Sequence, residues 1–166
     1  MKKLVSILLS LALVVSLGIP CAADEMNGLD WSGNNVSTVN PFELYYSSIA
    51  RGTSYPTVSH NCHGAPLEFS GNASYSMLWL NKVVYGCSGY YVYVKNNAGT
   101  PLNYIVRGGT YGDRAMTVSP YSDSYTDNGG NPVYIPMSSH DALFCISFDA
   151  PSNFRGSVIC GCSFGG

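Results

Sequence analysis

The chain has 166 residues, 13 tyrosines, 18 glycines and a formal net charge of −2, and only 11% of its side chains are charged. Apart from Lys2 and Lys3, its basic side chains are scattered singly, which argues against the concentrated basic face that nucleic acids and anionic membranes require. A composition rich in Tyr, Gly, Ser and Asn and poor in charge is typical of an all-β domain and argues against a soluble helical bundle.

The first 23 residues have the three parts of a secretory signal peptide. Lys2 and Lys3 precede an almost unbroken apolar run over residues 4–17, and a Gly-Ile-Pro break leads to small residues that end at Ala23. The apolar run is shorter than the ~20 residues of a spanning helix and no second run follows, so an uncleaved anchor is the weaker interpretation. We therefore predict a mature chain that starts at residue 24, has no membrane span and acts outside the cell or at its surface.

Two short segments precede the main part of the chain. Residues 24–39 are polar and aperiodic, which predicts a loose N-terminal segment. A short helix is expected next, because Asn40 can cap it, Pro41 suits its first position and Gly52 can end it. The tyrosines and serines inside this stretch are also compatible with extended structure. We expect one folded domain over residues 40–166.

After Gly52 the sequence changes to a period of two, most clearly at residues 90–95. Asn-Asn-Ala-Gly at 96–99 follows, and then a second apolar run at 102–106, which together predict a β-hairpin. Alternation divides the side chains of the first strand between two faces, and the charge of Lys95 marks the outer face. The expected core set is Tyr90, Val92 and Val94, and the expected outer set is Tyr91, Tyr93 and Lys95.

Several other short apolar runs are separated by segments rich in Ser, Asp, Asn, Gly and Pro. Such segments are typical of turns between strands. About seven or eight short antiparallel strands at this spacing predict an all-β fold, a single β-sandwich of the Ig-like or jelly-roll type. The further strands are expected at residues 77–80, 83–85, 115–118, 133–136, 142–148 and 156–161.

Cysteine is the main constraint on chemistry after the signal peptide. In an exported domain the default is disulfide bonding, and each native bridge stabilises by about 2–4 kcal/mol. If the last two strands form a hairpin around residues 151–153, Cys145 lies opposite Cys160, which makes this the favoured pair. The number of candidates is odd, so at least one thiol is free or links to another molecule. The candidates are Cys62, Cys87, Cys145, Cys160 and Cys162.

The densest group of metal-ligating residue types is the His-Asn-Cys-His run at residues 60–63. In an extended segment His60 and Cys62 share a face, and a zinc or copper ion would need a further ligand such as His140 or Asp141. Structural zinc sites take paired ligands from two separated places, and only one such place is visible here. We therefore expect no metal and no cofactor, and interpret the run as a loop with surface imidazoles and a disulfide at Cys62.

The residue types of a small exported hydrolase are present, but no local motif supports one. Gly-x-Ser-x-Gly is absent, and the adjacent His140 and Asp141 would point apart on a strand. Aspartates at 113, 123 and 127 lie among turn residues, where a carboxylate usually bonds nearby backbone rather than a sugar or calcium. We expect no catalytic residue and keep the hydrolase as an alternative, whose candidates are Cys62 or Cys87, His63 or His140, and Asp141 or Asp149.

The tyrosines give the strongest functional indication. They are too many for one small core to hide, and several fall on the predicted outer face or in polar loops. High β-propensity alone would place some tyrosines on a solvated sheet face. Exposed rings beside small polar groups also make adaptable binding surfaces, so we predict recognition of a carbohydrate or protein ligand outside the cell. A structural envelope protein linked through the odd thiol is a further alternative. The candidate ligand-binding residues are Tyr91, Tyr93, Tyr121 and Tyr125.

Overall fold

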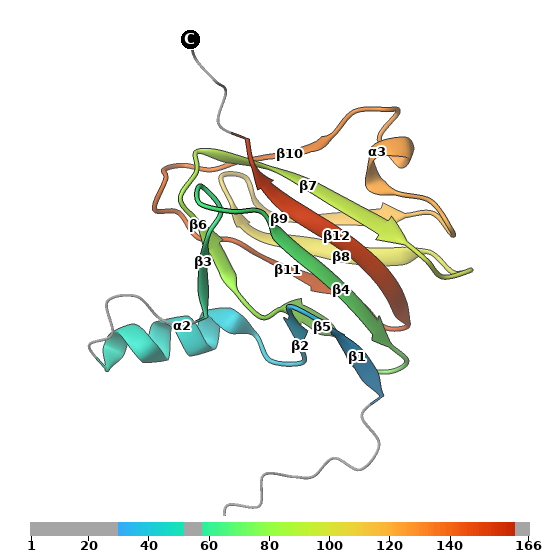
Figure 1. Cartoon of the computed structure of the whole chain (residues 1–166), viewed down its shortest axis with the longest axis horizontal. Coiled ribbons are helices and arrows are strands. Elements are labelled where there is room, and N and C mark those ends of the chain that lie inside the picture. Colours follow the sequence, from blue (N-terminus) through green and yellow to red (C-terminus); the bar gives the residue numbers. More distant parts are fainter. Residues whose placement is uncertain (1–29, 52–57, 162–166) are drawn as a thin grey trace, which may run out of the picture.

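The computed structural model describes residues 30–51 and 58–161, and these form two five-stranded sheets packed face to face (Figure 1). The predicted signal peptide and Cys162 lie outside the described residues. In the described part of the chain, no helix is both long and apolar enough to cross a membrane.

Both sheets are antiparallel throughout. The first sheet has the strand order β1 (Trp31–Asn34), β4 (Leu67–Ala73), β12 (Ser152–Cys160), β7 (Gly89–Asn96), β10 (Val133–Pro136). The second sheet has the order β2 (Val36–Ser37), β5 (Leu78–Leu80), β11 (Cys145–Phe148), β8 (Leu102–Gly109), β9 (Gly112–Val118). A short parallel pair, β3 (Ser59–Asn61) and β6 (Val83–Tyr85), forms a third, two-stranded sheet.

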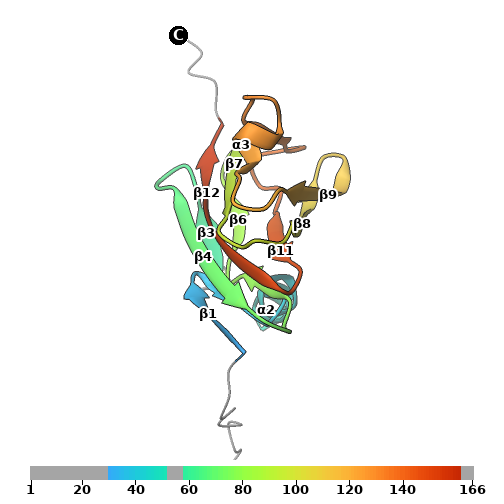
Figure 2. The ribbon, with the colours of Figure 1, turned by 90° about the vertical axis from the view of Figure 1, so that its right-hand side faces the viewer.

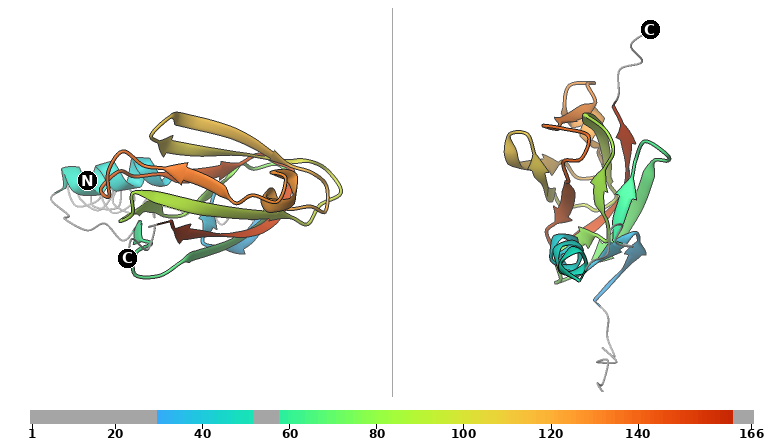
Figure 3. Two further views of the ribbon diagram at one scale, coloured as in Figure 1. Left: turned by 90° about the horizontal axis from the view of Figure 1, so that it is seen from above. Right: turned by 90° about the vertical axis from the view of Figure 1, so that its left-hand side faces the viewer.

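Strands that follow one another in the chain occupy equivalent positions in the two sheets: β4 and β5, β7 and β8, β9 and β10, β11 and β12. Figure 2 shows β4 and β12 in one layer and β8, β9 and β11 in the other. This order is that of a jelly roll, which decides between the two predicted sandwich types. The helices α2 (Pro41–Ala50) and α3 (Ser124–Asp127) lie at opposite ends of the sandwich (Figure 3).

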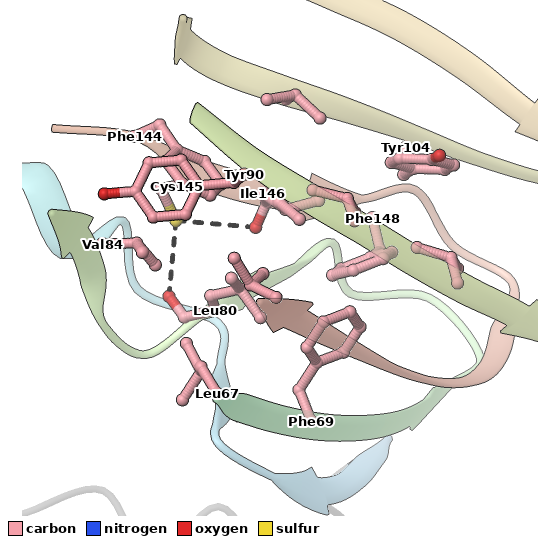
Figure 4. Packing of buried hydrophobic residues seen from close by; sticks show 14 of the residues in the cluster. Leu67, Phe69, Leu80, Val84, Tyr90, Tyr104, Phe144, Cys145, Ile146 and Phe148 are labelled. Atoms are coloured by element: carbon pink, nitrogen blue, oxygen red, sulfur yellow. Dashed lines mark hydrogen bonds between the residues drawn. The ribbon is translucent and has the colours of Figure 1, made fainter. Parts of the chain in front are cut away.

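The core between the sheets is built from the inward side chain of every second strand residue. Tyr90, Val92 and Val94 are at most 2% exposed, while Tyr91 and Tyr93 are 42% and 38% exposed, so the predicted faces of β7 are confirmed. At the centre, the ring of Phe148 lies 3.8 Å from that of Phe154, 5.5 Å from that of Phe69 and 5.9 Å from that of Tyr104, measured between centroids (Figure 4). Such packed aromatic rings supply much of the buried apolar area of a small domain.

The predicted hairpin over residues 90–106 and the hairpin assumed for the last two strands are both wrong, for one reason. The strands at 90–95 and 102–106 are β7 and β8, and those at 142–148 and 156–161 are β11 and β12; in each case the partners lie in opposite sheets. Alternation shows which side chains face the core, but two strands that face each other across the core have the same pattern as two neighbours in one sheet. A connection of a few residues spans the ~10 Å between packed sheets. The hairpin that does form joins β8 to β9.

The N-terminal region is more ordered than predicted. Within the expected loose segment, residues 31–34 form β1 and residues 36–37 form β2, which pair with β4 and β5 at one edge of each sheet. The helix prediction is confirmed: the Asn40 side chain accepts a hydrogen bond from the Phe42 backbone N–H at 3.0 Å, and Pro41 occupies the first turn of α2. Strand pairing explains why β1 and β2 were not predicted. An edge strand of two to four residues depends on its neighbour and leaves little hydrophobic pattern in the sequence.

Candidate ligand-binding surface

The outer face of the first sheet carries a row of half-exposed apolar side chains. Strand register sets Tyr134 of β10 opposite Tyr91 of β7, and Tyr91 opposite Ile159 of β12. These three side chains are 41%, 42% and 45% exposed. The rings of Tyr91 and Tyr134 lie 5.3 Å apart between centroids and are tilted by 52°. A Cβ atom at Gly89 would overlap the Tyr134 ring, so glycine there lets the ring lie against the backbone.

A turn and the short helix α3 add a further ring to this row. Tyr125, on α3, is 50% exposed and lines a hollow of about 180 Å³ together with Tyr91, Tyr93 and Ile159. The backbone N–H of Val94 donates to the Ser124 hydroxyl at 3.0 Å, which ties α3 to β7. We call Tyr91, Tyr93, Tyr125, Tyr134 and Ile159 the tyrosine patch.

Two aspartates hold the turn that carries Tyr125. Asp123 accepts a hydrogen bond from the Thr126 backbone N–H at 2.8 Å and caps α3. Asp127 accepts hydrogen bonds from the Ser119 backbone N–H and, at 2.7 Å, from the Ser122 hydroxyl. Hydrogen bonds from these backbone N–H groups lower the pKa of both carboxyl groups. Both aspartates thus have the turn-forming role that their neighbours in the sequence predicted.

A polar hollow lies next to the tyrosine patch, and Tyr93 lines both. Its volume is about 430 Å³. Arg155 lies opposite Lys95 and Ser70 on the neighbouring strands, and its guanidinium forms no ion pair with another described residue. Burial, and then the negative charge of Asp123, raises the pKa of the Tyr93 hydroxyl, which stays neutral and donates a hydrogen bond to the Asp123 carboxylate. The lining residues are Asn34, Glu68, Phe69, Ser70, Tyr93, Arg155, Gly156 and Ser157.

The structure brings together three of the four predicted ligand-binding tyrosines: Tyr91, Tyr93 and Tyr125. Tyr121 lies elsewhere: it is 73% exposed, and its hydroxyl would lie 2.9 Å from a Cβ atom at Gly99, in the connection between β7 and β8. Sequence reasoning missed Tyr134 and Ile159. Period-two alternation within their own strands would have placed both on an outer face, but only strand register shows that they flank Tyr91.

The favoured disulfide, Cys145–Cys160, is wrong, because β11 and β12 lie in different sheets. Cys160 is bonded instead to Cys87, with 5.8 Å between the Cα atoms. Cys145 is a free, fully buried thiol whose Sγ lies 3.6 Å from the Leu80 carbonyl oxygen (Figure 4). The disulfide expected at Cys62 is also wrong: this thiol is free and buried, with its Sγ 3.7 Å from the Val158 carbonyl oxygen.

The environments of these thiols bear on the alternative functions. Burial raises the pKa of Cys62 to about 11 and that of Cys145 to about 12, so neither is held as a reactive thiolate at neutral pH. Cys87, the other candidate nucleophile, is occupied by its disulfide. Buried thiols also cannot reach a second chain, so neither Cys62 nor Cys145 is placed to link subunits.

The histidines are dispersed. In the sequence, His60 and Cys62 form a candidate pair of metal ligands. In the structure, the His60 Nε2 lies 2.9 Å from the Ala65 carbonyl oxygen, and Cys62 is buried in the core. His140 is exposed in a loop, where its carbonyl oxygen accepts a hydrogen bond from the Gly86 N–H. His63 is the exception, since it lies beside the Cys87–Cys160 bridge.

Comparison of the chain with protein-family models, with curated proteins and with solved structures finds no match. Function therefore has to be inferred from the chemistry of the described surface. On this surface the tyrosine patch is joined to the polar hollow through Tyr93.

Proposed function

We propose that this protein is a secreted, non-enzymatic carbohydrate-binding domain, and that the outer face of its first sheet binds a single glycan chain. The observation that carries the proposal is the continuity of the tyrosine patch with the polar hollow. A sugar ring has an apolar face of C–H groups, which packs on aromatic rings, and a rim of hydroxyl groups that need hydrogen-bond partners. The patch offers the first kind of contact and the hollow offers the second.

The geometry of the rings favours a soluble chain over a flat crystalline polysaccharide. Tyr91 and Tyr134 are tilted by 52°, so both rings cannot lie flat against one planar surface. Both rings are half-buried against neighbouring strands, so little side-chain freedom is lost when a ligand packs on them.

The hollow supplies donors and acceptors of different kinds. Arg155 is a donor with a full positive charge, Glu68 is a charged acceptor, and the Ser157 hydroxyl can act as either. Hydrogen bonds from a charged group are about twice as strong as neutral ones, so Arg155 and Glu68 are suited to fix the orientation of sugar hydroxyl groups.

Export supports a ligand outside the cell. The predicted signal peptide directs the chain out of the cytosol, and the Cys87–Cys160 disulfide fits an oxidising compartment. The same compartment holds cell-wall and secreted polysaccharides.

The test is affinity electrophoresis of the purified protein through gels that contain soluble polysaccharides. The double variant Tyr91→Ala plus Tyr93→Ala should lose about 100-fold in affinity, because two ring contacts of roughly 1–1.5 kcal/mol each are removed. Its thermal unfolding should change little. The matched control is Tyr111→Ala, which removes a 77% exposed tyrosine from the turn between β8 and β9 in the other sheet.

Two results would end the proposal. If the double variant migrates like the wild type in every retarding gel, the patch is not the binding site. If the wild type is retained only by whole cells, and protease treatment of those cells abolishes the retention, then the ligand is a protein.

A further inference from the structure

A histidine and two cysteine sulfurs meet where the first sheet ends. Cys160 is the last residue of β12, Cys87 follows β6, and His63 follows β3. Their ligand atoms all lie within 4.8 Å of one another. In the described part of the chain, this is the one group of three or more His, Cys, Asp or Glu side chains close enough to hold a metal ion.

Backbone hydrogen bonds hold these three residues in place independently of the disulfide. The parallel pairing of β3 with β6 sets Asn61 opposite Tyr85, and the Cys62 N–H donates to the Tyr85 carbonyl oxygen at 3.1 Å. The Asn61 side chain accepts a hydrogen bond from the His63 N–H at 2.9 Å, which shapes the turn.

The two cysteine positions are supported in the same way. The Cys87 N–H donates to the hydroxyl of the fully buried Tyr90 at 2.9 Å. Beyond Cys160, the Gly161 N–H donates to the Gly89 carbonyl oxygen at 2.8 Å. Opening the S–S bond would therefore leave the two sulfur atoms and the imidazole close together.

We propose that reduction of the Cys87–Cys160 disulfide creates a Cys2His site for Zn²⁺. Ligands that bind one zinc ion at about 2.1–2.3 Å lie roughly 3.5–4 Å from one another in a tetrahedron. The present separations within 4.8 Å come into that range by side-chain rotation once the sulfurs are no longer bonded. His63 is exposed and Cys160 is half-buried, so the ion can enter from solvent and complete its coordination with water.

The chemistry balances with a dithiol as reductant. The dithiol transfers two electrons and two protons to the S–S bond, becomes a disulfide itself and leaves two thiols on the protein. Zinc then binds both sulfurs as thiolates, which releases two protons, and takes a lone pair from the neutral imidazole. Two thiolates neutralise the charge of the ion, so the partly buried site carries no net charge.

Soft sulfur ligands favour zinc over calcium or magnesium. The two remaining described thiols do not compete, because Cys62 and Cys145 are buried within the core. Within residues 30–51 and 58–161, the oxidised and reduced forms of the protein therefore differ at one surface site. The oxidised form holds a covalent bridge there, and the reduced form holds an ion.

The experiment reduces the purified protein with a dithiol, removes the reagent by gel filtration under nitrogen, and adds Zn²⁺ or Co²⁺. Zinc should raise the melting temperature of the reduced wild type by several degrees and leave the oxidised protein unchanged. Cobalt should give a thiolate-to-metal charge-transfer band. His63→Gln should weaken the affinity by at least about tenfold, since even neighbours that only orient a ligand are worth that much.

The matched control is His60→Gln, which removes the other imidazole of the same segment and should bind zinc like the wild type. If reduction alone unfolds the protein, recovery of the near-UV circular dichroism on zinc addition replaces the melting shift, and its absence counts against the site. Equal binding by the oxidised protein, equal binding by His63→Gln, or cobalt binding without a thiolate band would each overturn the proposal.

Discussion

The outer faces of the two sheets both carry aromatic side chains, but in different surroundings. On the second sheet, the guanidinium of Arg107 lies over the Trp79 ring, 5.0 Å from its centroid. The same guanidinium donates to the Ser147 hydroxyl at 3.1 Å and pairs with Asp113 at 2.7 Å. Ser147 is fully buried. The aromatic ring, the cation and the hydroxyl of this face are therefore engaged with one another.

On the first sheet, the equivalent groups are available. Tyr91 contacts Tyr134 while both remain about two-fifths exposed, and Arg155 has no ion-pair partner among the described residues. An aromatic residue on a solvated strand is thus not by itself a sign of binding, because β-propensity alone would place it there. What distinguishes the two faces is whether the polar groups beside the rings are already paired.

The largest expected effect is a difference in the free energy of unfolding between a variant that loses the Trp79 ring and one that loses the Tyr91 ring. Trp79→Ala should lower the free energy of unfolding by about 2–3 kcal/mol, because it removes a packed ring and its contact with the Arg107 guanidinium. Tyr91→Ala should cost about 1 kcal/mol or less, since its ring is half in solvent. Urea denaturation of both variants measures the contrast. Equal losses would mean that the Tyr91 ring supports the fold as much as that of Trp79.

The sequence predicts the features of these faces that depend on neighbouring residues in the chain, but not those that depend on pairing between distant strands. Alternation along β7 correctly divides core from surface, and the capping residues correctly place α2, because both signals are local. The strand partners of Tyr91, and the Trp79 and Ser147 side chains beside Arg107, come from strands far away in the chain, and no local pattern specifies that register. The same gap accounts for the two wrong hairpins.

The cysteines show the limit most directly. Cys145 and Cys160 are symmetric about a turn, which favours their pairing in a hairpin, but the chain changes sheets at that turn. Cys87 pairs with Cys160 because the fold brings together two segments that are distant in the chain, and no local sequence pattern predicts this contact. The candidate zinc ligand His63 was visible as a residue type, but its neighbours were not.

Truncation of Arg107 should lower the stability of the protein, whereas truncation of Arg155 should hardly change it. Arg107→Ala is expected to destabilise by about 2 kcal/mol, mainly because it strips the cation from Trp79 and leaves the buried Ser147 hydroxyl without its partner. The exposed ion pair with Asp113 adds little to this. Arg155→Ala should change stability by less than ~0.5 kcal/mol, and it relieves the like charge of Lys95 opposite.

For glycan affinity the order of the two effects should be reversed, with the larger loss in Arg155→Ala. Arg155→Ala is expected to weaken retention about tenfold, the value of one charge-assisted hydrogen bond, whereas Arg107→Ala should leave retention unchanged at temperatures where it is folded. Thermal unfolding and affinity electrophoresis on the same two proteins provide both measurements. Retention that falls only in step with unfolding would show that Arg155 makes no contact with the ligand.

The smallest expected effect is a loss of glycan retention in acid, caused by the turn that carries Tyr125. The pKa of Asp127 is lowered in the folded protein by the hydrogen bond from the Ser119 N–H. Its contribution to stability is therefore present above the unfolded pKa, about 3.9, and is lost as pH falls through the lower folded value. Asp123, whose pKa is lowered by the Thr126 N–H, behaves in the same way.

Retention should therefore weaken in the wild type over the range from about pH 4 down through the folded pKa, before the sheets unfold. Asp127→Asn should bind more weakly at pH 5 and change less over that range, because its amide does not titrate. Glu68 contributes another carboxylate to the lining of the hollow, so both proteins are compared with Glu68→Gln in place. Identical pH profiles for the two would show that the turn at residues 119–127 does not set the position of Tyr125 for binding.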